Sequence, residues 1–317
     1  MAPSENDRTR EEAREARESE ADLEHGQLPL QAQRRLAQET GPHPLFATDL
    51  NIGEFLLARS EGYEAVGQVM GSSIYHVGWQ WAPGYMSSGE LTIITRAHME
   101  ARGLALGRME AEAKQLGAHG VVGVRLTTRS YEWGPNMIEF TAIGTAVRLR
   151  GAPPPQTPFL SDLSGEDFWT LVQAGYLPKG LAMGFCSYFV YSSNKVYFST
   201  FLGPQQYNQM SSWWNQELTN FSQGVYQARH YAMQRLEQDL VRLDAQGVVG
   251  VKVETHKRLI EGGDNQPTHL VVDFFALGTA IARAAPRPRL TTPSLVMNMT
   301  GLRPVRPRLE GAELQES

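Results

Sequence analysis

In two stretches of the chain, mostly apolar residues recur three and four positions apart, which is the spacing of one face of an α-helix. The first covers residues 90–116 and the second covers residues 217–243. The positions on this face are Leu91, Ile94, His98, Ala101, Ala105, Met109, Ala113 and Leu116 in the first stretch and Leu218, Phe221, Val225, Ala228, Ala232, Leu236, Leu240 and Leu243 in the second. Because nearly all of them are apolar, each stretch predicts a long helix that buries a single face.

Runs of β-branched and aromatic residues lie on both sides of each predicted helix. Residues 68–79 predict a strand and a turn before the first helix, and residues 181–201 predict a longer β-hairpin before the second. After each helix come a Val-Val-Gly-Val run and a last strand that contains Gly-Thr-Ala. We therefore expect an α+β protein of two tandem β-α-β-β units, each a long helix packed on an antiparallel sheet.

The two halves also repeat each other in sequence, which indicates a duplicated structural unit. Phe46-Ala-Thr-Asp-Leu50 returns as Phe159-Leu-Ser-Asp-Leu163 after 113 residues. From the start of the long helix the spacing becomes 127, which places a 14-residue insertion in the second copy between Val190 and Glu217. We expect the two copies to share one fold.

The repeats divide the chain into five segments. Charged and amide side chains dominate the N-terminal segment, so we expect a disordered tail there, although its residues 28–36 are amphipathic enough to dock on another surface. Three consecutive prolines hold the linker between the repeats extended. The segments are the charged tail 1–45, the first repeat 46–150, the linker 151–158, the second repeat 159–285 and an irregular tail rich in Pro, Arg and Met at 286–317.

A short additional helix is expected at the start of each repeat. Asn51 with Glu54, and Ser164 with Asp167, have the spacing of a capping box. About eleven residues further on, Gly62 and its counterpart in the second repeat suit the left-handed position that ends a helix.

Six glycines are expected to be structural. Gly123 and Gly250 interrupt the β-branched runs, where a glycine lets another backbone or a helix come close. The full set is Gly120, Gly123, Gly144, Gly247, Gly250 and Gly278.

Composition narrows the classes of function. Of the 317 residues, 41% are apolar and 20% are charged, and the net charge of −5 argues against general nucleic-acid binding. The single cysteine, Cys186, excludes disulfides and Cys-cluster metal sites within one chain and favours a reducing compartment.

Residues 1–20 lack the apolar core of a secretory signal, and no window approaches the roughly 20 apolar residues of a membrane span. We expect a cytoplasmic protein without a transmembrane segment.

Three motifs of the first repeat carry a family resemblance. They are Ala101-Arg102-x-x-Ala105, Leu116-Gly-Ala-x-Gly-Val-Val-Gly-Val124 and Gly144-Thr-Ala-Val147. In this order they resemble the YbjQ family, small bacterial domains labelled as heavy-metal-binding. The resemblance covers nearly all of the first repeat and, more loosely, the second. It implies a β-α-β-β unit with a long helix across an antiparallel sheet, and subunits that assemble into pentameric rings. This chain departs from the single-domain pattern by fusing two copies and adding a short helix to each.

Residues that could carry chemistry are few and scattered. The candidate metal ligands are His98, His119 and Cys186. Packing explains His98 and Cys186 more simply, because the second repeat has Val225 at the position of His98 and because aromatic residues surround Cys186. These residues close no tetrahedral site locally, so we predict no metal or other cofactor. A site shared between chains, to which each contributes one or two groups, is the alternative. No hydrolase or nucleotide-binding motif occurs, so we expect no enzyme.

The second repeat has an excess of aromatic residues. Alternation along a strand puts Phe185, Phe189 and Tyr191 on one face of the predicted hairpin, and Trp213 and Trp214 follow nearby. A hairpin this aromatic cannot bury both faces inside one small unit. We therefore treat these five residues as interface candidates that cover either the other repeat or another chain.

Two classes of function follow. The first is a non-catalytic bacterial module for oligomerisation and interaction, in which residues 290–302 of the C-terminal tail add as a strand to a protein partner. The second is a metal- or small-ligand-binding protein with sites at repeat or subunit boundaries.

A homo-oligomer is the expected assembly, and the duplication constrains its size. If each repeat takes the place of one subunit in a YbjQ-like ring, every chain supplies two units and a closed ring contains an even number of them. Three chains then give six units and five chains give ten. Alternatively, the insertion blocks growth and the chain stays a pseudo-dimer.

Overall fold

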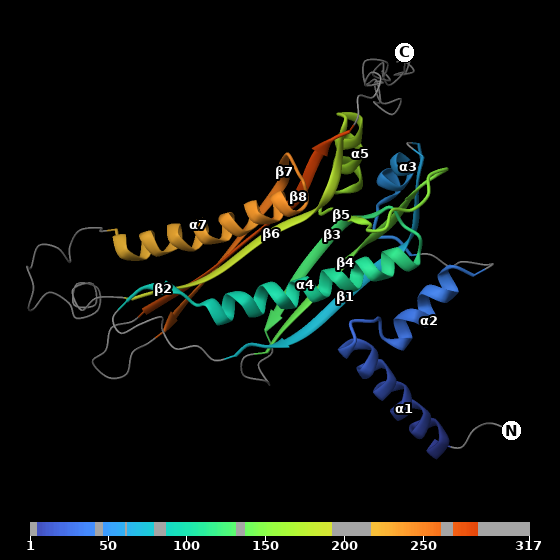
Figure 1. Ribbon diagram of the computed structural model, residues 1–317, viewed down its shortest axis with the longest axis horizontal. Helices are drawn as coiled ribbons and strands as arrows, with labels where there is room; N and C mark the ends of the chain where they lie inside the picture. The colour runs from blue at the N-terminus through green and yellow to red at the C-terminus, as the bar shows by residue number, and fades with distance from the viewer. Residues whose placement is uncertain are drawn as a thin grey trace, which may run out of the picture.

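The structure is a computed structural model, and it describes residues 5–41, 47–60, 62–78, 87–130, 137–191, 217–260 and 269–284. Figure 1 shows the arrangement of its helices and strands. Among the described residues, no helix combines the length and the apolar character needed to cross a membrane.

Each repeat folds into the same unit. The first unit consists of α3 (Ile52–Ser60), β1 (Tyr63–His76), α4 (Thr92–Gln115), β3 (Gly120–Ser130) and β4 (Met137–Leu149). The second consists of α5 (Gly165–Gln173), β6 (Tyr176–Val190), α7 (Thr219–Arg242), β7 (Gly247–Ile260) and β8 (His269–Arg283). In each unit the last strand lies between the other two and pairs antiparallel with both. The predicted α+β fold of two tandem β-α-β-β units, each with a short preceding helix, is confirmed.

The two units share their irregularities as well. The pairing of β3 with β4 shifts around Gly123, and the pairing of β7 with β8 shifts around Gly250. Both glycines have a φ of 66°, in the left-handed region that side chains with a Cβ rarely adopt. A glycine at this bulge is therefore a requirement of the backbone.

The short helices begin with the predicted caps. The Asn51 side chain accepts the Glu54 N–H at 2.9 Å, and the Glu54 carboxylate accepts the Asn51 N–H at 2.8 Å. Ser164 Oγ accepts the Asp167 N–H at 3.1 Å at the start of α5. The caps fix where each short helix starts and hold it beside the strand that follows.

Each unit lends a short strand to the sheet of the other. The strand β5 (Phe159–Leu160) comes from the second repeat and pairs parallel with β3, so that sheet 1 has the order β1-β4-β3-β5. The strand β2 (Gly89–Glu90) comes from the first repeat and pairs antiparallel with β6, so that sheet 2 has the order β2-β6-β8-β7.

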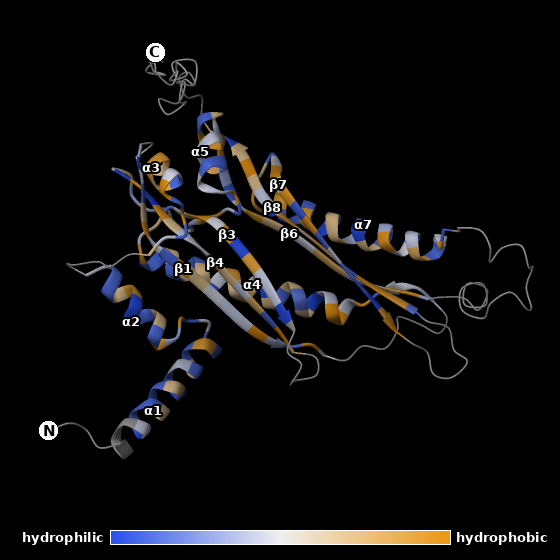
Figure 2. Ribbon diagram, turned by 180° about the vertical axis from the view of Figure 1, so that it is seen from behind, coloured by the Kyte–Doolittle hydropathy of each residue, from blue (hydrophilic) through white to orange (hydrophobic). Residues whose placement is uncertain are grey.

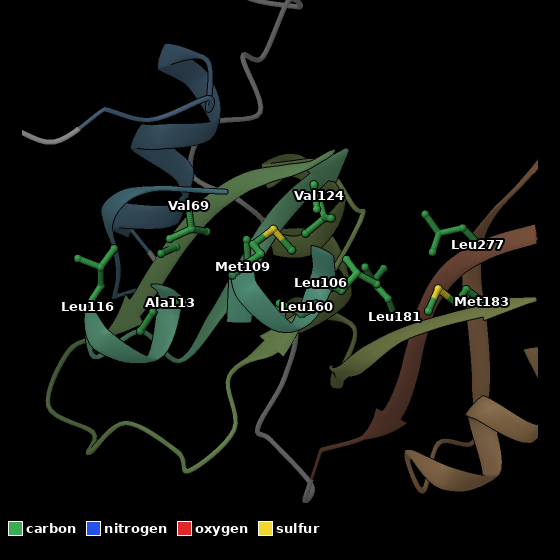
Figure 3. Packing of buried hydrophobic residues seen from close by; sticks show 14 of the residues in the cluster. Val69, Leu106, Met109, Ala113, Leu116, Val124, Leu160, Leu181, Met183 and Leu277 are labelled. Atoms are coloured by element: carbon green, nitrogen blue, oxygen red, sulfur yellow. The ribbon is translucent and has the colours of Figure 1, made fainter. Parts of the chain in front are cut away.

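The long helices and the sheets alternate in layers, with α4 between the two sheets and α7 on the far side of sheet 2 (Figure 1). The largest core cluster crosses from one unit to the other, because Leu106 and Met109 of α4 belong to it together with Leu181, Met183 and Leu277 of sheet 2 (Figure 3). The two units therefore share part of one hydrophobic core.

The N-terminal segment differs from the expected tail, because it contains α1 (Glu5–Glu24) and α2 (Leu30–Glu39). Figure 2 shows mostly hydrophilic residues along α1, which projects from the rest of the molecule. The amphipathic piece docks, since Leu28 and Leu36 are buried in the core cluster that contains α4. An ion pair of 2.6 Å between Arg35 and Glu112 joins α2 to α4. Burial of these two leucines explains why this part of the charged segment is ordered.

The structure describes only the first strand of the predicted hairpin at 181–201. The strand β6 begins at Tyr176 and continues to Val190 without a turn. The described residues do not include the second half of that hairpin, Trp213, Trp214 or the tail at 286–317.

The contact between β1 and α4 yields a first prediction. A Cβ on Gly71 would lie 1.9 Å from the carbonyl oxygen of Ala105 and 2.6 Å from the backbone nitrogen of Met109. Gly71→Ala is therefore expected to lower the free energy of unfolding by about 1–3 kcal/mol, measured by urea denaturation, because the helix must move away from the sheet.

The matched control for this variant is Gly107→Ala, in the middle of α4. A Cβ there meets nothing within 4 Å, so this variant is expected to gain about 0.5–1 kcal/mol from the lower backbone entropy of alanine in the unfolded chain. Equal stabilities of the two variants would contradict the close packing of α4 on β1.

Candidate functional site

The joint between the two units is the candidate functional site, and its first part is a backbone contact. The segment 159–163 runs beside β3, and its backbone forms hydrogen bonds with that strand. They are Phe159 N–H to His119 O (3.1 Å), Ser161 N–H to Val121 O (2.9 Å), Val124 N–H to Ser161 O (2.9 Å) and Gly123 N–H to Leu163 O (2.8 Å). The outer edge of β3 is therefore covered by the second unit.

Side chains of the second unit hold this segment in place. Thr279 Oγ1, on β8, donates to Asp162 Oδ1 at 2.6 Å and accepts the Asp162 N–H at 3.1 Å. Ser161 Oγ lies 3.0 Å from the same Thr279 hydroxyl, and Lys252 Nζ lies 3.2 Å from Asp162 Oδ2. The side chains of this segment therefore bind to the sheet of its own unit, whereas its backbone pairs with the sheet of the other unit.

The first unit contains the same arrangement at residues 47–50. The Asp49 N–H donates to Thr145 Oγ1 at 3.1 Å, and Thr48 Oγ1 lies 3.3 Å from that oxygen. The Asp49 carboxylate pairs with Arg125, as Asp162 pairs with Lys252. The segment that precedes each unit is therefore held on its own sheet by the same contacts.

The second part of the joint is the face of α4 that meets sheet 2. The His98 ring stacks on Phe185 with centroids 4.3 Å apart, and the Arg102 guanidinium lies 3.8 Å from the centroid of the Phe275 ring. The rings of Phe140 and Phe185 lie 4.7 Å and 4.9 Å from the same guanidinium. Aromatic faces attract a cation at such distances, so Arg102 links α4 to both sheets.

Arg102 keeps its charge although its side chain is only 3% exposed. Burial lowers the pKa of Arg102 to about 9, while the negative charges of Glu254 and Asp273 oppose that change. The guanidinium is consequently protonated at neutral pH. Within the described chain, no acceptor forms a hydrogen bond with its Nε or Nη1.

Polar contacts close the joint at the start of α4. The Ser187 N–H donates to Thr95 Oγ1 at 3.0 Å, and the Leu91 N–H donates to the Ser187 carbonyl at 2.8 Å. Glu90 and Arg235 form an ion pair of 2.6 Å between β2 and α7. These contacts align α4 with β6.

The structure does not bring the three candidate metal ligands together. His98 faces sheet 2 through its stacking on Phe185, whereas Cys186 belongs to the cluster on the α7 side of the same strand. His119 follows the end of α4, where its Nδ1 accepts the Leu149 N–H at 3.2 Å. Gln246 takes the same role in the second unit, by accepting the Arg283 N–H. His119 therefore has a structural hydrogen bond in the place where its counterpart has one.

These residues do not fit a heavy-metal site. Burial raises the pKa of the Cys186 thiol to about 12, which disfavours the thiolate that binds metals. In the part of the chain that the structure describes, no group of three or more His, Cys, Asp or Glu side chains is placed to hold a metal ion.

The aromatic interface candidates on β6, and Tyr191 directly after it, lie toward the first unit. Phe185 belongs to the core cluster shared with α4, and Phe189 packs in a cluster with Leu91. Tyr191 stacks on His269 of β8, with ring centroids 5.0 Å apart.

The predicted structural glycines lie at close contacts in three places. A Cβ on Gly120 would lie 2.4 Å from the ring of Phe159. In the middle strands, Cβ atoms on Gly144 and Gly278 would lie 2.6 Å from Val121 and 2.7 Å from Val248. Gly247 differs from its counterpart Gly120, because a Cβ there meets nothing within 4 Å among the described residues.

A cavity of about 370 Å³ opens at the joint, where the two preceding segments lie close together. Asp49, Arg125, Asp162 and Lys252 line it, and they form the two ion pairs described above. Glu54, also in its wall, accepts the Gly165 N–H at 3.1 Å. The charged groups of the cavity are thus engaged with the protein itself.

Sequence reasoning did not select Arg102 or Thr279 as functional residues. A signal was present for both, because Arg102 recurs as Arg229 at the spacing of the long helices and Thr279 recurs as Thr145 in the last strands. Their partners come from distant parts of the chain, so the pattern alone did not show what they contact.

Comparisons with known proteins agree with this architecture. Residues 63–150 match the model of the YbjQ family, described as "Putative heavy-metal-binding". The "Encapsulin nanocompartment protein Rv1762c" of Mycobacterium tuberculosis is 38% identical over 259 residues, which are 80% of this chain and 92% of that protein. A "UPF0145 protein" of Thermus thermophilus is 41% identical over 93 residues, 28% of this chain and 80% of its own. One of Archaeoglobus fulgidus is 43% identical over 91 residues, 27% of this chain and 82% of its own.

The fold and the joint define a protein built from a repeated unit that packs against a second copy of itself. The chain belongs to the YbjQ family, and it contains the unit of that family twice. The resemblance seen in the sequence is confirmed. None of the names given above describes a catalytic activity.

The environment of His98 yields a second prediction. Burial and, to a lesser extent, the charges of Arg102 and Arg258 lower the pKa of His98 from 6.5 to about 3. As the pH falls below 6.5, the unfolded chain takes up a proton that the folded chain does not. The free energy of unfolding therefore falls with decreasing pH, by up to about 1.4 kcal/mol per pH unit.

His98→Val introduces the residue that the second unit has at this position, Val225, and removes this sensitivity. Its stability relative to the native protein is expected to rise by up to about 2 kcal/mol between pH 6.5 and pH 5, measured by urea denaturation. His230→Gln, on the exposed side of α7, is the control and should show no such rise. A difference between His98→Val and the native protein that stays constant with pH would contradict the buried, neutral histidine.

Proposed function

We propose that this protein is a non-catalytic assembly module whose copies associate head to tail, and that it serves a protein nanocompartment. The helix α7 carries the proposal. Arg102 of α4 is buried against sheet 2, whereas its counterpart in α7, Arg229, is exposed. The unit thus has a helix face that is covered in the first repeat and open in the second.

The matching surface is the face of sheet 1 that points away from α4. Met183 of β6 is 8% exposed because it packs in the cluster with α4, whereas its counterpart Met70 of β1 is 47% exposed. A copy that placed its α7 on this face of a neighbour would repeat the contact already made between α4 and sheet 2. The charges also correspond, because Glu139 of β4 is the counterpart of Asp273, whose carboxylate attracts Arg102.

Such a contact joins two different surfaces, so each added copy presents the next open face. Assemblies of this kind close into rings or grow into filaments. Every chain supplies two units, so a closed ring holds an even number of them.

The similarity to a protein named for an encapsulin nanocompartment supports a role in assembly, because it extends over 80% of this chain and covers both units. The family description as heavy-metal-binding supports the alternative, a metal- or ligand-binding protein. We favour assembly, because the open faces of α7 and β1 are features of the described residues. The candidate ligands are apart, since His98 and Cys186 lie on different sides of β6 and His119 follows the end of α4.

Reversal of one charge on α7 gives the third prediction. Light scattering of the full chain at micromolar concentration is expected to show the mass of two or more chains of 35.3 kDa. Arg229→Glu is expected to lower that mass, because it places a carboxylate beside Glu139 of the neighbour. Gln234→Glu is the matched control. Its counterpart in α4, Gly107, is exposed although α4 packs against sheet 2, so a charge at this position should lie outside the contact. Negative-stain electron microscopy of the same sample separates closed rings from filaments. A mass of one chain for the native protein would disprove the proposal.

A further inference from the structure

We propose that copies of this chain are joined by strand addition, in which residues 47–50 of one copy pair with the outer edge of β7 at residues 247–251 of another. This inference rests on the proposed self-association and names the backbone contact that produces it. The occupant of the β7 edge is thus a second copy of the same chain.

Among the described residues no strand covers the outer edge of β7, in contrast to the edge of its counterpart β3. In sheet 1, β5 covers the outer edge of β3, whereas β7 is the last strand of sheet 2 as far as the structure describes it. The residues that would accept a strand read Gly-Val-Val-Gly-Val at 247–251, without a charge, while the following residues 252–258 carry most of the charges of this strand. Charged residues protect an exposed edge from unwanted pairing, so the uncharged part is the part free to pair.

The segment that would pair is already held in the required conformation. Ser161 and Asp162 are bound to Thr279, and Thr48 and Asp49 are bound in the same way to Thr145. The Leu50 N–H donates to Thr48 Oγ1 at 3.2 Å, as the Leu163 N–H donates to Ser161 Oγ at 3.3 Å. Segment 159–163 uses its free backbone side to pair with β3. Segment 47–50 presents the same side, so little entropy is lost when it binds.

The glycine at the start of each edge strand gives an independent observation. The ring of Phe159 lies against Gly120, so closely that a Cβ there would be 2.4 Å from it. At the equivalent Gly247, nothing lies within 4 Å of a Cβ among the described residues. By the repeat spacing, Phe46 is the counterpart of Phe159. A glycine in a strand marks the close approach of another group, and in the proposed assembly a neighbouring copy supplies that group at Gly247.

This space provides a test that leaves the single chain intact. Gly247→Val places a side chain where the described residues of the single molecule leave room and where the paired segment of the neighbour would lie. Light scattering is expected to show the mass of one 35.3 kDa chain with an unchanged circular dichroism spectrum. Thr255→Val, on the exposed and charged part of the same strand, is the control and should keep the native mass.

The register is tested by disulfide formation between two singly substituted proteins. The pairing of Val121 with Leu160 predicts that Val248 of one copy faces Ala47 of another. Facing residues of neighbouring strands lie roughly within the 4.4–6.8 Å between Cα atoms that a disulfide spans. A mixture of Val248→Cys and Ala47→Cys is expected to give a covalent pair containing one chain of each. Leu259→Cys, at the far end of β7, should not link to Ala47→Cys. The native Cys186 is buried and supplies little background.

The outcomes separate this inference from the proposed function. A native protein of one-chain mass overturns both. Strand addition is overturned if the multimer persists in Gly247→Val. It is also overturned if Ala47→Cys forms disulfides equally well with Val248→Cys and with Leu259→Cys. Either result leaves the proposed self-association in place. A multimer that Gly247→Val dissociates, but in which Ala47→Cys forms no disulfide with Val248→Cys, overturns the assignment of residues 47–50 as the occupant of the β7 edge.

Discussion

Helix α4 packs against a sheet on each of two sides, and the arrangement of the chain depends on this. Toward sheet 1, Gly71 lets the backbone of α4 come so close that no Cβ fits between them. Toward sheet 2, His98 and Arg102 lie against aromatic rings. Since a helix covered on both sides buries charged and polar groups, the second side needs partners such as the faces of Phe185 and Phe275. The two units are therefore built around one shared helix.

In the proposed assembly, the duplication lets this contact repeat between chains. The first unit offers a helix face and a strand edge to the second, and the second unit offers the same two features outward, on α7 and β7. A contact between unlike surfaces leaves one of each open at the ends of every chain. The two sheets also differ in sequence at this surface. The face of sheet 2 that covers α4 has Phe185, whereas the open face of sheet 1 has Ser72 at the same position of the repeat. The buried copy of the interface is the more apolar one.

In the described part of the chain, the candidate metal ligands are placed apart, although the family is described as "Putative heavy-metal-binding". His98 lies between rings and a buried arginine, where its protonation is disfavoured. Cys186 faces α7 from the other side of β6. His98 and Cys186 are parts of the packing between the long helices and sheet 2, and His119 accepts a backbone hydrogen bond. The cavity at the joint likewise holds charges that pair with one another and hold the preceding segments in place.

The sequence by itself determined the unit: the helical spacing, the capping boxes, the bulge glycines and the repeat offset predicted two copies of one fold. These features depend on contacts between residues close along the chain, or on backbone conformations that only glycine adopts readily. Only the tertiary structure decided which surfaces meet. It showed that the units exchange β2 and β5, that Arg102 is buried, and that Leu28 and Leu36 hold the N-terminal segment on the core. Those partners lie far apart along the chain, and their pairing depends on shape and burial in three dimensions, for which local spacing carries no signal.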